Sequence, residues 1–597
     1  MKTVAAWLSR KETGKHQENL NNINYYQSVT NQRWAAATLV PNTCLYQDDD
    51  GKTYITAGTP YWEDLDSQGI STAQQLERIY QRYGSKLLHH THGSFALVII
   101  DPQKDLLLAA VDRMGTQNLA YYCSGDTILI AGECKTIKSL SPIPLAISRQ
   151  AIFNYLYYHV IPSPATIYQN VFKLEPGQML EWQNGELKLD QYWIPDFTEH
   201  HASEQDLKKE LHNLLDKSVS RCLSGSGTIG AFLSGGLDSS TVTGYLAKHV
   251  SGADSFSIGF DQPGYDEMEY ARIAANHFKT TPHEFYLNPE IATDNIADIA
   301  AYYDEPFGNS SALPTYFCAK LAKDNGIDTL LAGDGGDEIF AGNARYAKQI
   351  IFSHYARIPK VLRSTLLEPL FLRTPLKMIT PTRKVARYIE QAIIDMPERL
   401  ETYNFLYNTK LDDIFSNEFL DQVDPQQPTK QLSECYEKVK GGDIVKRMLH
   451  LDWKFTLADN DLKKVGNMCA MAGVNVRYPM LDDELISFSN RIPSNKLINA
   501  RTLRKFYKNS MHGFLPNEIL NKSKHGFGLP FGLWMKSHKP LTEIAYSAME
   551  KMRERNILNN EFIDQSIKQH QEGHAAYYGE LIWITMMLEL WLQHNEY

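Results

Sequence analysis

Apolar residues in the first third of the chain come in short runs separated by turn residues. Between residues 25 and 193 these runs have the length and composition of β-strands, and one helical pattern over 73–83 interrupts them. Two pairs of runs have turn chemistry between them and predict β-hairpins, which join 95–101 to 106–112 and 119–123 to 127–132. We therefore expect a first domain, residues 1–200, that is dominated by strands.

A polar stretch with proline near residue 200 ends this pattern. Ser203 and Asp206 then indicate the start of a helix. Beyond them apolar runs alternate with helical patterns, which predicts a parallel sheet with right-handed helical crossovers. The predicted strands are 228–233, 254–260, 283–287 and 328–333, and the helices between them include 240–250 and 268–278. From Ile339 onward the pattern is mostly helical, so we expect an α/β second domain, residues 201–597, with a helical C-terminal part.

The composition of the chain says more about its partners and its compartment than about its fold. The chain has 597 residues, of which 43% are apolar, and a net charge of −10; this is typical of a globular protein and does not favour nucleic acid as a partner. Its seven cysteines form no C-x-x-C pair, which argues against a zinc ribbon and a disulfide framework. No apolar run is long enough for a signal-peptide core or a membrane span. We expect a soluble cytoplasmic protein without nucleic-acid or membrane partners, and a homodimer remains open.

The stretch Ile229–Ser240, IGAFLSGGLDSS, carries the first chemical signal. Its glycines and serines follow a predicted strand and open a predicted helix, where backbone N–H groups and the helix dipole favour a phosphate. The loop lacks the lysine of a G-x-x-x-x-G-K-[ST] motif and contains Asp238 instead, and a carboxylate beside phosphates needs Mg²⁺ between them. A turn that needs only glycines and caps is the alternative. The string Gly225–Gly230 matches G-x-G-x-x-G but precedes its strand, so we do not assign it a nucleotide.

A second acidic glycine loop, LLAGDGGDEIF at 330–340, follows another predicted parallel strand. Ligands of such sheets bind at the carboxyl ends of the strands. We therefore predict that Asp238 and Asp337 share Mg²⁺ on one pyrophosphate. Alternatively, Asp337 and Glu338 occupy the first turn of the next helix and only stabilise its dipole.

Six strings together resemble the synthetase domain of asparagine synthetases, in the large family of ATP pyrophosphatase (PP-loop) amide ligases. They are FLSGGLDSS, SFSIGF, DEPFGNSSALPTYF, GDGGDEIFAGNARY, NVRYPMLDDELI and NKSKHGFGLPFG, in the order of the family and between residues 205 and 540. The resemblance implies a carbon–nitrogen ligase in which ATP reacts at its α-phosphorus with a substrate carboxylate. The products are an acyl-adenylate and magnesium pyrophosphate, and an amine then displaces AMP to leave an amide.

The same resemblance assigns roles to individual residues. Asp238 and Asp337 would bind Mg²⁺, and Lys524 would stabilise charge on the α-phosphate, although a solvated loop lysine is the alternative. Asp334, where many asparagine synthetases have Glu, would act as general base or only shape its loop; the implied catalytic residues are thus Lys524, Asp334 and Asp337. The implied ATP-binding residues are Leu233, Ser234, Gly235, Gly236, Asp238, Ser239, Ser240, Ser257, Ile258, Gly259, Gly333, Asp334 and Gly335.

The first domain resembles the glutaminase domain of the same family, through GSFALVIIDPQKDLLLAAVDRMGTQNLAYY, AGECKTI and LEPGQML. The implied fold is the αββα sandwich of N-terminal nucleophile hydrolases, which need cysteine as the first mature residue. Here Lys2 follows the initial methionine, and Cys44 is the first cysteine. The string AGTPYW replaces the family's N-G-E-I-Y-N, and Ala73 lies near the position of an expected acidic residue. We predict an inactive glutaminase and reject Cys44 and Cys123 as replacement nucleophiles.

The second domain also departs from the family pattern. The family usually has a D-R-M-S-M string before the arginine of NVRYP, whereas residues 466–477 here read GNMCAMAGVNVR, which puts recognition of aspartate in doubt. β-Lactam synthetases and lasso peptide cyclases combine intact ATP chemistry with an inactive glutaminase, and AGTPYWEDL, VDRMG and GNARYAKQ are most similar to the cyclases. That resemblance implies that an Asp or Glu side chain of a precursor peptide is activated and attacked by the peptide's own amino terminus, with the precursor peptide and its protease as partners.

Three alternatives remain open at this stage. Aromatic residues between 346 and 407 would help to grip a peptide or would belong to the core. The enzyme could be an asparagine synthetase that uses ammonia or, with less support, glutamine. A catalytically silent nucleotide-binding scaffold is the alternative outside enzymes, and the retained Asp238, Asp337 and Lys524 argue against it.

Overall fold

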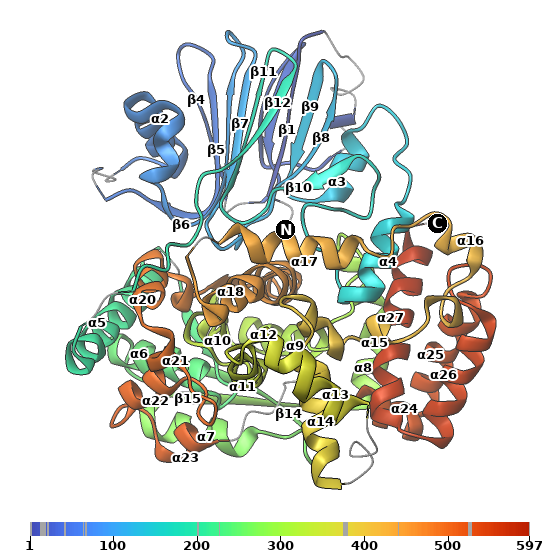
Figure 1. Ribbon diagram of the computed structural model, residues 1–597. Coiled ribbons are helices and arrows are strands. Elements are labelled where there is room, and N and C mark those ends of the chain that lie inside the picture. The colour runs from blue at the N-terminus through green and yellow to red at the C-terminus, as the bar shows by residue number, and fades with distance from the viewer. Residues whose placement is uncertain are drawn as a thin grey trace.

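Two bodies of unequal size make up the protein (Figure 1). The computed structural model describes residues 3–11, 19–20, 23–40, 43–63, 65, 69–199, 202–225, 227–373, 380–439, 441–522 and 528–595. The smaller body contains two packed sheets, and the larger one is mainly helical around a parallel sheet. No helix within these residues is long and apolar enough to cross a membrane.

The smaller body is a sandwich of two six-stranded antiparallel sheets. One has the order β10 (Val171–Lys173), β8 (Ala120–Ser124), β9 (Thr127–Ala131), β1 (Val4–Ser9), β3 (Trp34–Thr38), β2 (Gln27–Asn31). The other has the order β12 (Glu186–Gln191), β11 (Gln178–Gln183), β7 (Leu106–Val111), β6 (His92–Asp101), β5 (Thr53–Tyr61), β4 (Thr43–Gln47). Both predicted hairpins are confirmed, as β6–β7 and β8–β9.

Alternation along the strands explains the layers of this body. Ala6 of β1 and Val98 of β6 belong to the apolar core between the sheets, while their sequence neighbours point to the outer faces. Helix α2 (Thr72–Tyr83) covers one outer face and α3 (Cys134–Leu140) covers the other. The body is therefore the αββα sandwich expected for the first domain.

A five-stranded parallel sheet organises the larger body. Its order is β15 (Thr281–Leu287), β14 (Asp254–Phe260), β13 (Ile229–Phe232), β16 (Thr329–Leu331), β17 (Asn475–Arg477). Leu330 belongs to an apolar core with α9 (Ala312–Asp324) and α19 (Leu462–Ala472), whereas the adjacent Leu331 belongs to one with α6 (Leu237–His249) and α7 (Met268–Phe278), so helices cover both faces of the sheet. The four predicted strands are confirmed. The fifth, β17, was not predicted, because it has only three residues and follows a long helical region.

Beyond residue 200, the first helix of the larger body is α5 (Glu204–Leu223), whose first turn is capped by the Ser203 hydroxyl. The helices that surround the sheet and extend to the C-terminal part are α6 (Leu237–His249), α7 (Met268–Phe278), α8 (Pro289–Tyr302), α9 (Ala312–Asp324), α10 (Gly336–Phe340), α17 (Gln427–Lys438), α18 (Ile444–Leu451), α19 (Leu462–Ala472), α20 (Asp483–Arg491), α22 (Lys505–Met511), α24 (Phe531–Ser537), α25 (Lys539–Lys551), α26 (Asn560–Glu572) and α27 (Ala575–His594). The shorter helices are α15 (Phe405–Asn408), α16 (Asn417–Leu420), α21 (Ser494–Leu497) and α23 (Asn517–Asn521).

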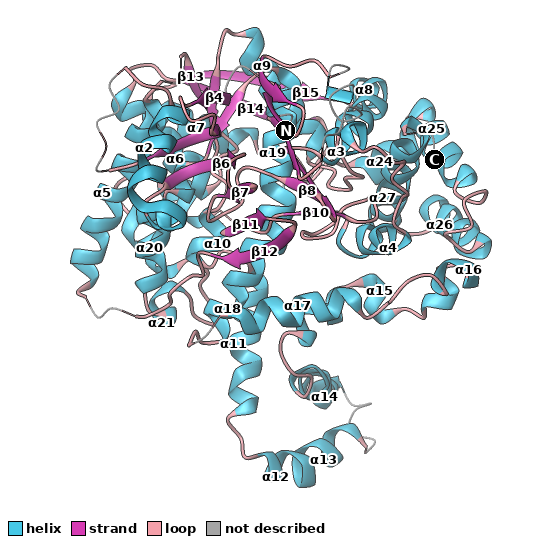
Figure 2. Ribbon diagram, turned by 90° about the horizontal axis from the view of Figure 1, so that it is seen from above, coloured by secondary structure: helices cyan, strands magenta, loops and turns pink. Residues whose placement is uncertain are grey.

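A helical arm, residues 344–395, projects from the larger body (Figure 2). It consists of α11 (Ala344–Ala356), α12 (Lys360–Leu362), a π-helical turn (Arg363–Leu367), α13 (Glu368–Leu372) and α14 (Thr380–Ala392). Phe352, Tyr355 and Ile389 form a small apolar cluster of its own. The aromatic residues of this region are thus partly the core of the arm itself.

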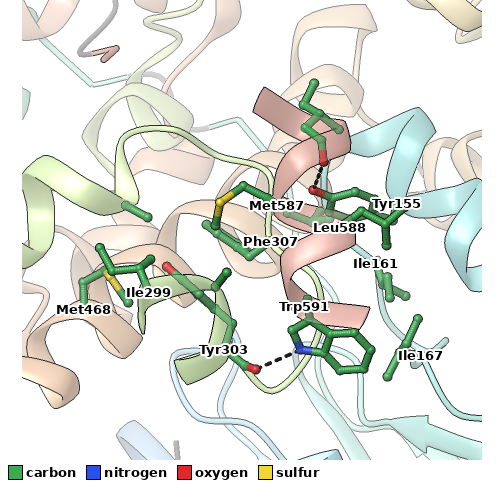
Figure 3. Close-up of a cluster of buried hydrophobic side chains, with 14 of the residues drawn as sticks. Tyr155, Ile161, Ile167, Ile299, Tyr303, Phe307, Met468, Met587, Leu588 and Trp591 are labelled. Carbon is green, nitrogen blue, oxygen red and sulfur yellow. Dashed lines mark hydrogen bonds between the residues drawn. The ribbon is translucent and has the colours of Figure 1, made fainter. Parts of the chain in front are cut away.

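The two bodies share an apolar core where α4 (Arg149–Tyr158) packs against α27 (Figure 3). The Tyr155 hydroxyl donates to the Ile584 carbonyl at 2.8 Å, and Trp591 Nε1 donates to the Tyr303 carbonyl at 3.1 Å. Helix α4 therefore lies with the larger body although it precedes residue 200. The boundary at residues 200 and 201 stays a prediction for the chain.

Buried charges join the two bodies beside this core. Lys173 on β10 lies 2.5 Å from the carboxylate of Glu305. The neighbouring carboxylate of Asp304 accepts the backbone N–H groups of Cys134 and Lys135, at the start of α3, at 2.5 and 2.7 Å. Each charge is thus paired or hydrogen-bonded, as buried charges must be.

Asp304 is expected to make stability depend on pH. Burial, together with Glu133 and Glu305, raises the pKa of Asp304 to about 6, whereas an aspartate in an unfolded chain titrates near 4. The folded protein keeps this proton after the unfolded chain has lost it. The resulting stabilisation, at most roughly 3 kcal/mol, is therefore complete below about pH 4 and lost as the pH rises through about 6.

The variant Asp304→Asn cannot titrate at this position, so it provides the comparison. We expect the melting temperature of the wild type minus that of Asp304→Asn to fall as the pH is raised from about 4 to 6.5. Thermal denaturation followed by intrinsic fluorescence measures this difference. A difference that is the same at every pH would show that Asp304 does not titrate in this range.

Candidate active site

The predicted phosphate loop follows β13, the central strand of the parallel sheet. β13 ends at Phe232 and α6 begins at Leu237. Gly235, between them, has φ of 68°, and a Cβ there would lie 2.5 Å from the backbone of Tyr270. Only glycine fits this turn, because both the backbone angle and the space exclude a side chain. The sequence therefore folds here into a tight turn that aims the start of α6 outward from the sheet.

Hydroxyl groups fix the shape of this loop. The Ser234 and Ser239 hydroxyls lie 3.0 Å apart, and Ser239 Oγ also accepts the Ser234 N–H at 3.2 Å. Ser257 on the adjacent strand β14 donates its hydroxyl to the Leu233 carbonyl at 2.6 Å. The three serines thus hold the loop as a preformed cradle.

The acidic loop after β16 packs directly against this cradle. A Cβ on Gly333 would lie 2.7 Å from the backbone nitrogen of Ser239, so glycine permits the close approach. Gly335 has φ of 98° and precedes α10, whose first turn contains Asp337. Asp337 is therefore both a first-turn residue of a helix and a neighbour of the phosphate loop.

A buried arginine connects the two loops. One Arg504 guanidinium nitrogen donates to Asp238 Oδ2 at 2.6 Å and to Asp337 Oδ1 at 2.9 Å, and the other contacts Asp238 as well. The Arg504 side chain is 4% exposed, and its backbone is in the left-handed region at φ 53°, which is uncommon for a residue other than glycine. The carboxylates of Asp238 and Asp337 thus lie close enough to share a single cation.

The loops line a cavity of about 700 Å³, within the range of small-molecule sites. The predicted residues that line it are Leu233, Ser234, Gly236, Asp238, Ser239, Ser257, Ile258, Gly333, Asp334, Gly335 and Asp337. Three others do not line it. Gly235 forms the turn behind the loop, Ser240 is fully buried in α6, and Gly259 packs against the ring of Tyr286. Lys524 lies outside the described residues, so its predicted role stays untested.

Three lysines that the sequence did not single out also line the cavity: Lys464, Lys508 and Lys522. Lys522 lies 3.0 Å from Glu267 and is 8% exposed, and Lys464 lies 2.7 Å from Asp461. Lys522 stands two residues before Lys524 in the string NKSKHGFGLPFG. That string therefore indicated a lysine at the site, but it did not indicate that Lys522 lines the cavity. Lys464 and Arg504 have no such signal, because their positions depend on how distant segments fold.

Asp334 has the environment of a proton-accepting group. Burial raises its pKa to about 6, against the opposing effect of Lys464, and Asp461 raises it further. A carboxyl with this pKa is ionised at neutral pH but binds a proton more firmly than an ordinary aspartate, which suits a general base. Its position in the cavity wall leaves both predicted roles open.

The donor set fits Mg²⁺ bound together with a nucleotide. Asp238 and Asp337 offer two carboxylates to one cation, and Mg²⁺ commonly takes one or two carboxylates and completes its shell with phosphate oxygens and water. Among the described residues, no group of three or more His, Cys, Asp or Glu could hold a metal by itself. The site therefore suits a metal that arrives with phosphates. The backbone N–H groups and hydroxyls of the serine loop fit those phosphates.

Two glycines make room for these carboxylates, and we expect neither to tolerate a side chain. A Cβ on Gly336 would lie 2.0 Å from Asp238 Oδ1, and one on Gly342 would lie 1.8 Å from Asp337 Oδ1. Gly336→Ala and Gly342→Ala should each displace a carboxylate and lower ATP turnover by roughly 10²-fold, because small misplacements in a catalytic site cost that much.

The matched control is Gly528→Ala, whose Cβ would meet nothing within 4 Å. It should retain wild-type turnover, and all three variants should melt near the wild-type temperature. Wild-type turnover in Gly336→Ala and Gly342→Ala would show that the placement of these carboxylates does not matter.

Comparison with known proteins agrees with this geometry. The family model of asparagine synthase matches residues 210–593, and that of the glutamine amidotransferase domain matches residues 60–193. Similar proteins include asparagine synthetase [glutamine-hydrolyzing] 1 of Bacillus subtilis, 24% identical over 89% of this chain and 83% of its own length. A putative asparagine synthetase [glutamine-hydrolyzing] 2 of Methanocaldococcus jannaschii is 33% identical over 50% of this chain and 59% of its own length.

A relative with a different name shows that the family is diverse. The amidase chyE of Penicillium rubens is 24% identical over 78% of this chain and 74% of its own length. The asparagine synthase model covers well over half of the chain, including both loops of the cavity. The protein therefore belongs to the asparagine synthase family and is a carbon–nitrogen ligase.

Proposed function

We propose that this ligase activates a substrate carboxylate as an acyl-adenylate, and that an amine already present on the same substrate displaces AMP. The observation that carries the first step is the convergence of Asp238 and Asp337, from two strand ends, on one cation position beside the serine loop. This arrangement suits pyrophosphate as the bound and leaving group. The products would be an amide, AMP and pyrophosphate.

In this proposal, different residues of the cavity bind the phosphates, hold the metal and accept the proton. The loop from Ser234 to Ser239 would hold the β- and γ-phosphates through its hydroxyls and the N–H groups at the start of α6. Mg²⁺ between Asp238 and Asp337 would neutralise negative charge on those phosphates. Lys522, inside the cavity wall, and Lys524 are candidates for the charge that faces the α-phosphate. Asp334 would accept the proton that the attacking amine releases.

The first body supports an amine source other than glutamine. Its segment AGTPYW ends in contact with the larger body, where the Tyr61 ring lies under the Arg221 guanidinium, 5.1 Å from its centroid. Asp483 of the larger body accepts N–H groups from His92 and Gly93 at 3.2 Å. Burial raises the pKa of the Cys123 thiol, which makes it a weaker nucleophile at neutral pH. We propose that this body serves as a structural partner and has no glutaminase activity.

The acceptor side of the cavity supports a substrate other than free aspartate. Arg477, which follows the segment that departs from the family, donates to the Cys222 and Ser224 carbonyls at 2.8 Å and does not line the cavity. We propose that the substrate is an Asp or Glu side chain of a peptide, attacked by the amino terminus of that peptide. The precursor peptide and its protease would be the partners. The cytoplasm would be the compartment, which fits seven cysteines without a disulfide.

A peptide encoded beside this gene, with a free amino terminus and an internal Asp or Glu, provides the test. Incubated with the enzyme, ATP and Mg²⁺ but without glutamine or ammonium, it should lose one water per molecule, and acetylation of its amino terminus should prevent the loss. Free aspartate with ammonium should give little asparagine. Rapid formation of asparagine and an unchanged peptide would select the asparagine synthetase alternative instead.

A further inference from the structure

The tip of the helical arm exposes apolar side chains at an unusual density. Of the eleven aliphatic side chains that are exposed among the described residues, seven belong to the arm: Ile351, Val361, Leu362, Leu366, Leu370, Val385 and Ile393. Val361 is 72% exposed, the highest value among them. Surface leucines that occur singly are ordinary, whereas such a concentration indicates a binding surface.

The exposed leucines have the spacing of a ridge along one helix. Leu362, Leu366 and Leu370 follow one another at intervals of four, through α12, the π-helical turn and α13. The alternate ridge, with Leu367 and Phe371, packs inward on Phe352 and Tyr355. The helix is therefore apolar on two sides, and one of them is exposed.

The arm is also strongly basic in an acidic protein. Residues 344–395 contain ten Lys and Arg but three Asp and Glu, while the net charge of the whole chain is −10. On α14, Arg383, Lys384 and Arg387 are exposed, and α14 packs against α13. The basic residues thus lie on the helix next to the leucine ridge, and the rest of the protein carries the opposite charge.

We propose that the tip of the arm binds an anionic lipid surface, with Leu362 and Leu366 inserted at the headgroup level and Arg383, Lys384 and Arg387 against the lipid phosphates. Helices that combine exposed leucines with a basic face bind membranes in this way. The arm projects from the body, so its tip can reach a flat surface while the acidic body stays away from it (Figure 2). The inference does not depend on the substrate of the ligase.

Shape favours a lipid surface over a peptide. A peptide that docks through apolar side chains needs pockets or a groove, whereas the leucines here stand on a convex helix. The expectation that no membrane takes part rested on the charge of the whole chain and on the lack of a spanning segment. Neither the net charge of the whole chain nor the lack of a spanning segment excludes contact between one basic arm and a membrane surface.

Sedimentation of the full-length protein with vesicles tests the proposal. At low salt the wild type should sediment with phosphatidylcholine vesicles that contain phosphatidylglycerol and stay in solution with pure phosphatidylcholine. The triple variant Arg383→Glu, Lys384→Glu, Arg387→Glu should bind at least about a hundredfold more weakly, since each basic residue contributes roughly fivefold. The double variant Leu362→Ser, Leu366→Ser should also lose binding to the anionic vesicles.

A control triple places the same charge change elsewhere: Lys86→Glu, Lys209→Glu and Lys551→Glu, all exposed and outside the arm. It should bind anionic vesicles nearly as the wild type does, and every variant should keep its melting temperature. Equal loss in the control would reduce the effect to net charge and overturn the proposal. So would a wild type that stays in solution with anionic vesicles, or leucine variants that only change the oligomeric mass, which would assign the ridge to a second copy of the chain.

Discussion

Asp238→Asn is expected to lower substrate-dependent exchange of labelled pyrophosphate into ATP by roughly 10³-fold. The Asp238 carboxylate lies at the start of α6, faces the cavity and shares a cation position with Asp337. Asparagine keeps the size of the side chain but removes the charge that would hold Mg²⁺ on the leaving pyrophosphate. Exchange isolates the activation step, so the loss should appear there and not only in formation of the final product.

The control for this variant is Asp254→Asn. Asp254 begins β14, at the opposite end of the sheet, and pairs with His283 at 2.8 Å. It should leave exchange within a few-fold of the wild type, and both variants should remain folded by circular dichroism. If Asp238→Asn exchanges pyrophosphate as fast as Asp254→Asn does, the metal assignment is wrong.

Arg504→Met is expected to destabilise the metal-free protein by about 3–5 kcal/mol, the usual cost of breaking a buried ion pair. The variant leaves Asp238 and Asp337 close together without the guanidinium that joins them. Mg²⁺ that arrives with phosphates should then replace the lost charge, so adding Mg²⁺ with a non-hydrolysable ATP analogue should raise the melting temperature of Arg504→Met more than that of the wild type. Thermal denaturation in chelator and in Mg²⁺ with the analogue measures both effects without any turnover.

Arg504→Lys separates charge from geometry. Lysine keeps one positive charge but cannot contact both carboxylates with a rigid planar group, so its melting temperature in chelator should fall between those of the wild type and Arg504→Met. Equal responses to Mg²⁺ in all three proteins would show that the metal binds elsewhere.

The hairpins and the parallel strands could be predicted because their signals are local. Residues 95–112 alternate and turn within a few positions, and the run into Gly235 ends a buried strand with the residues that its tight turn needs. The sequence also indicated Asp238 and Asp337, since each follows a predicted strand of one parallel sheet. Their meeting point follows from topology alone.

The remaining parts depend on contacts that no local pattern encodes. Arg504 lies 266 positions from Asp238, and its role arises from a left-handed backbone turn at a residue that reads as an ordinary helix former. β17 joins the sheet with three residues. Helix α4 crosses to the larger body because its apolar side chains complete a core with α27, which a sequence boundary near residue 200 cannot show.

Oxygen transfer tests the central claim most directly. A substrate peptide whose Asp or Glu side chain carries ¹⁸O, incubated with the enzyme, ATP and Mg²⁺, should yield AMP with one ¹⁸O on its phosphate, because the carboxylate oxygen attacks the α-phosphorus and leaves with AMP. Phosphorus-31 NMR or mass spectrometry of the AMP reads this out. Unlabelled AMP, or ADP with ¹⁸O-labelled phosphate, would contradict activation of the carboxylate as an acyl-adenylate.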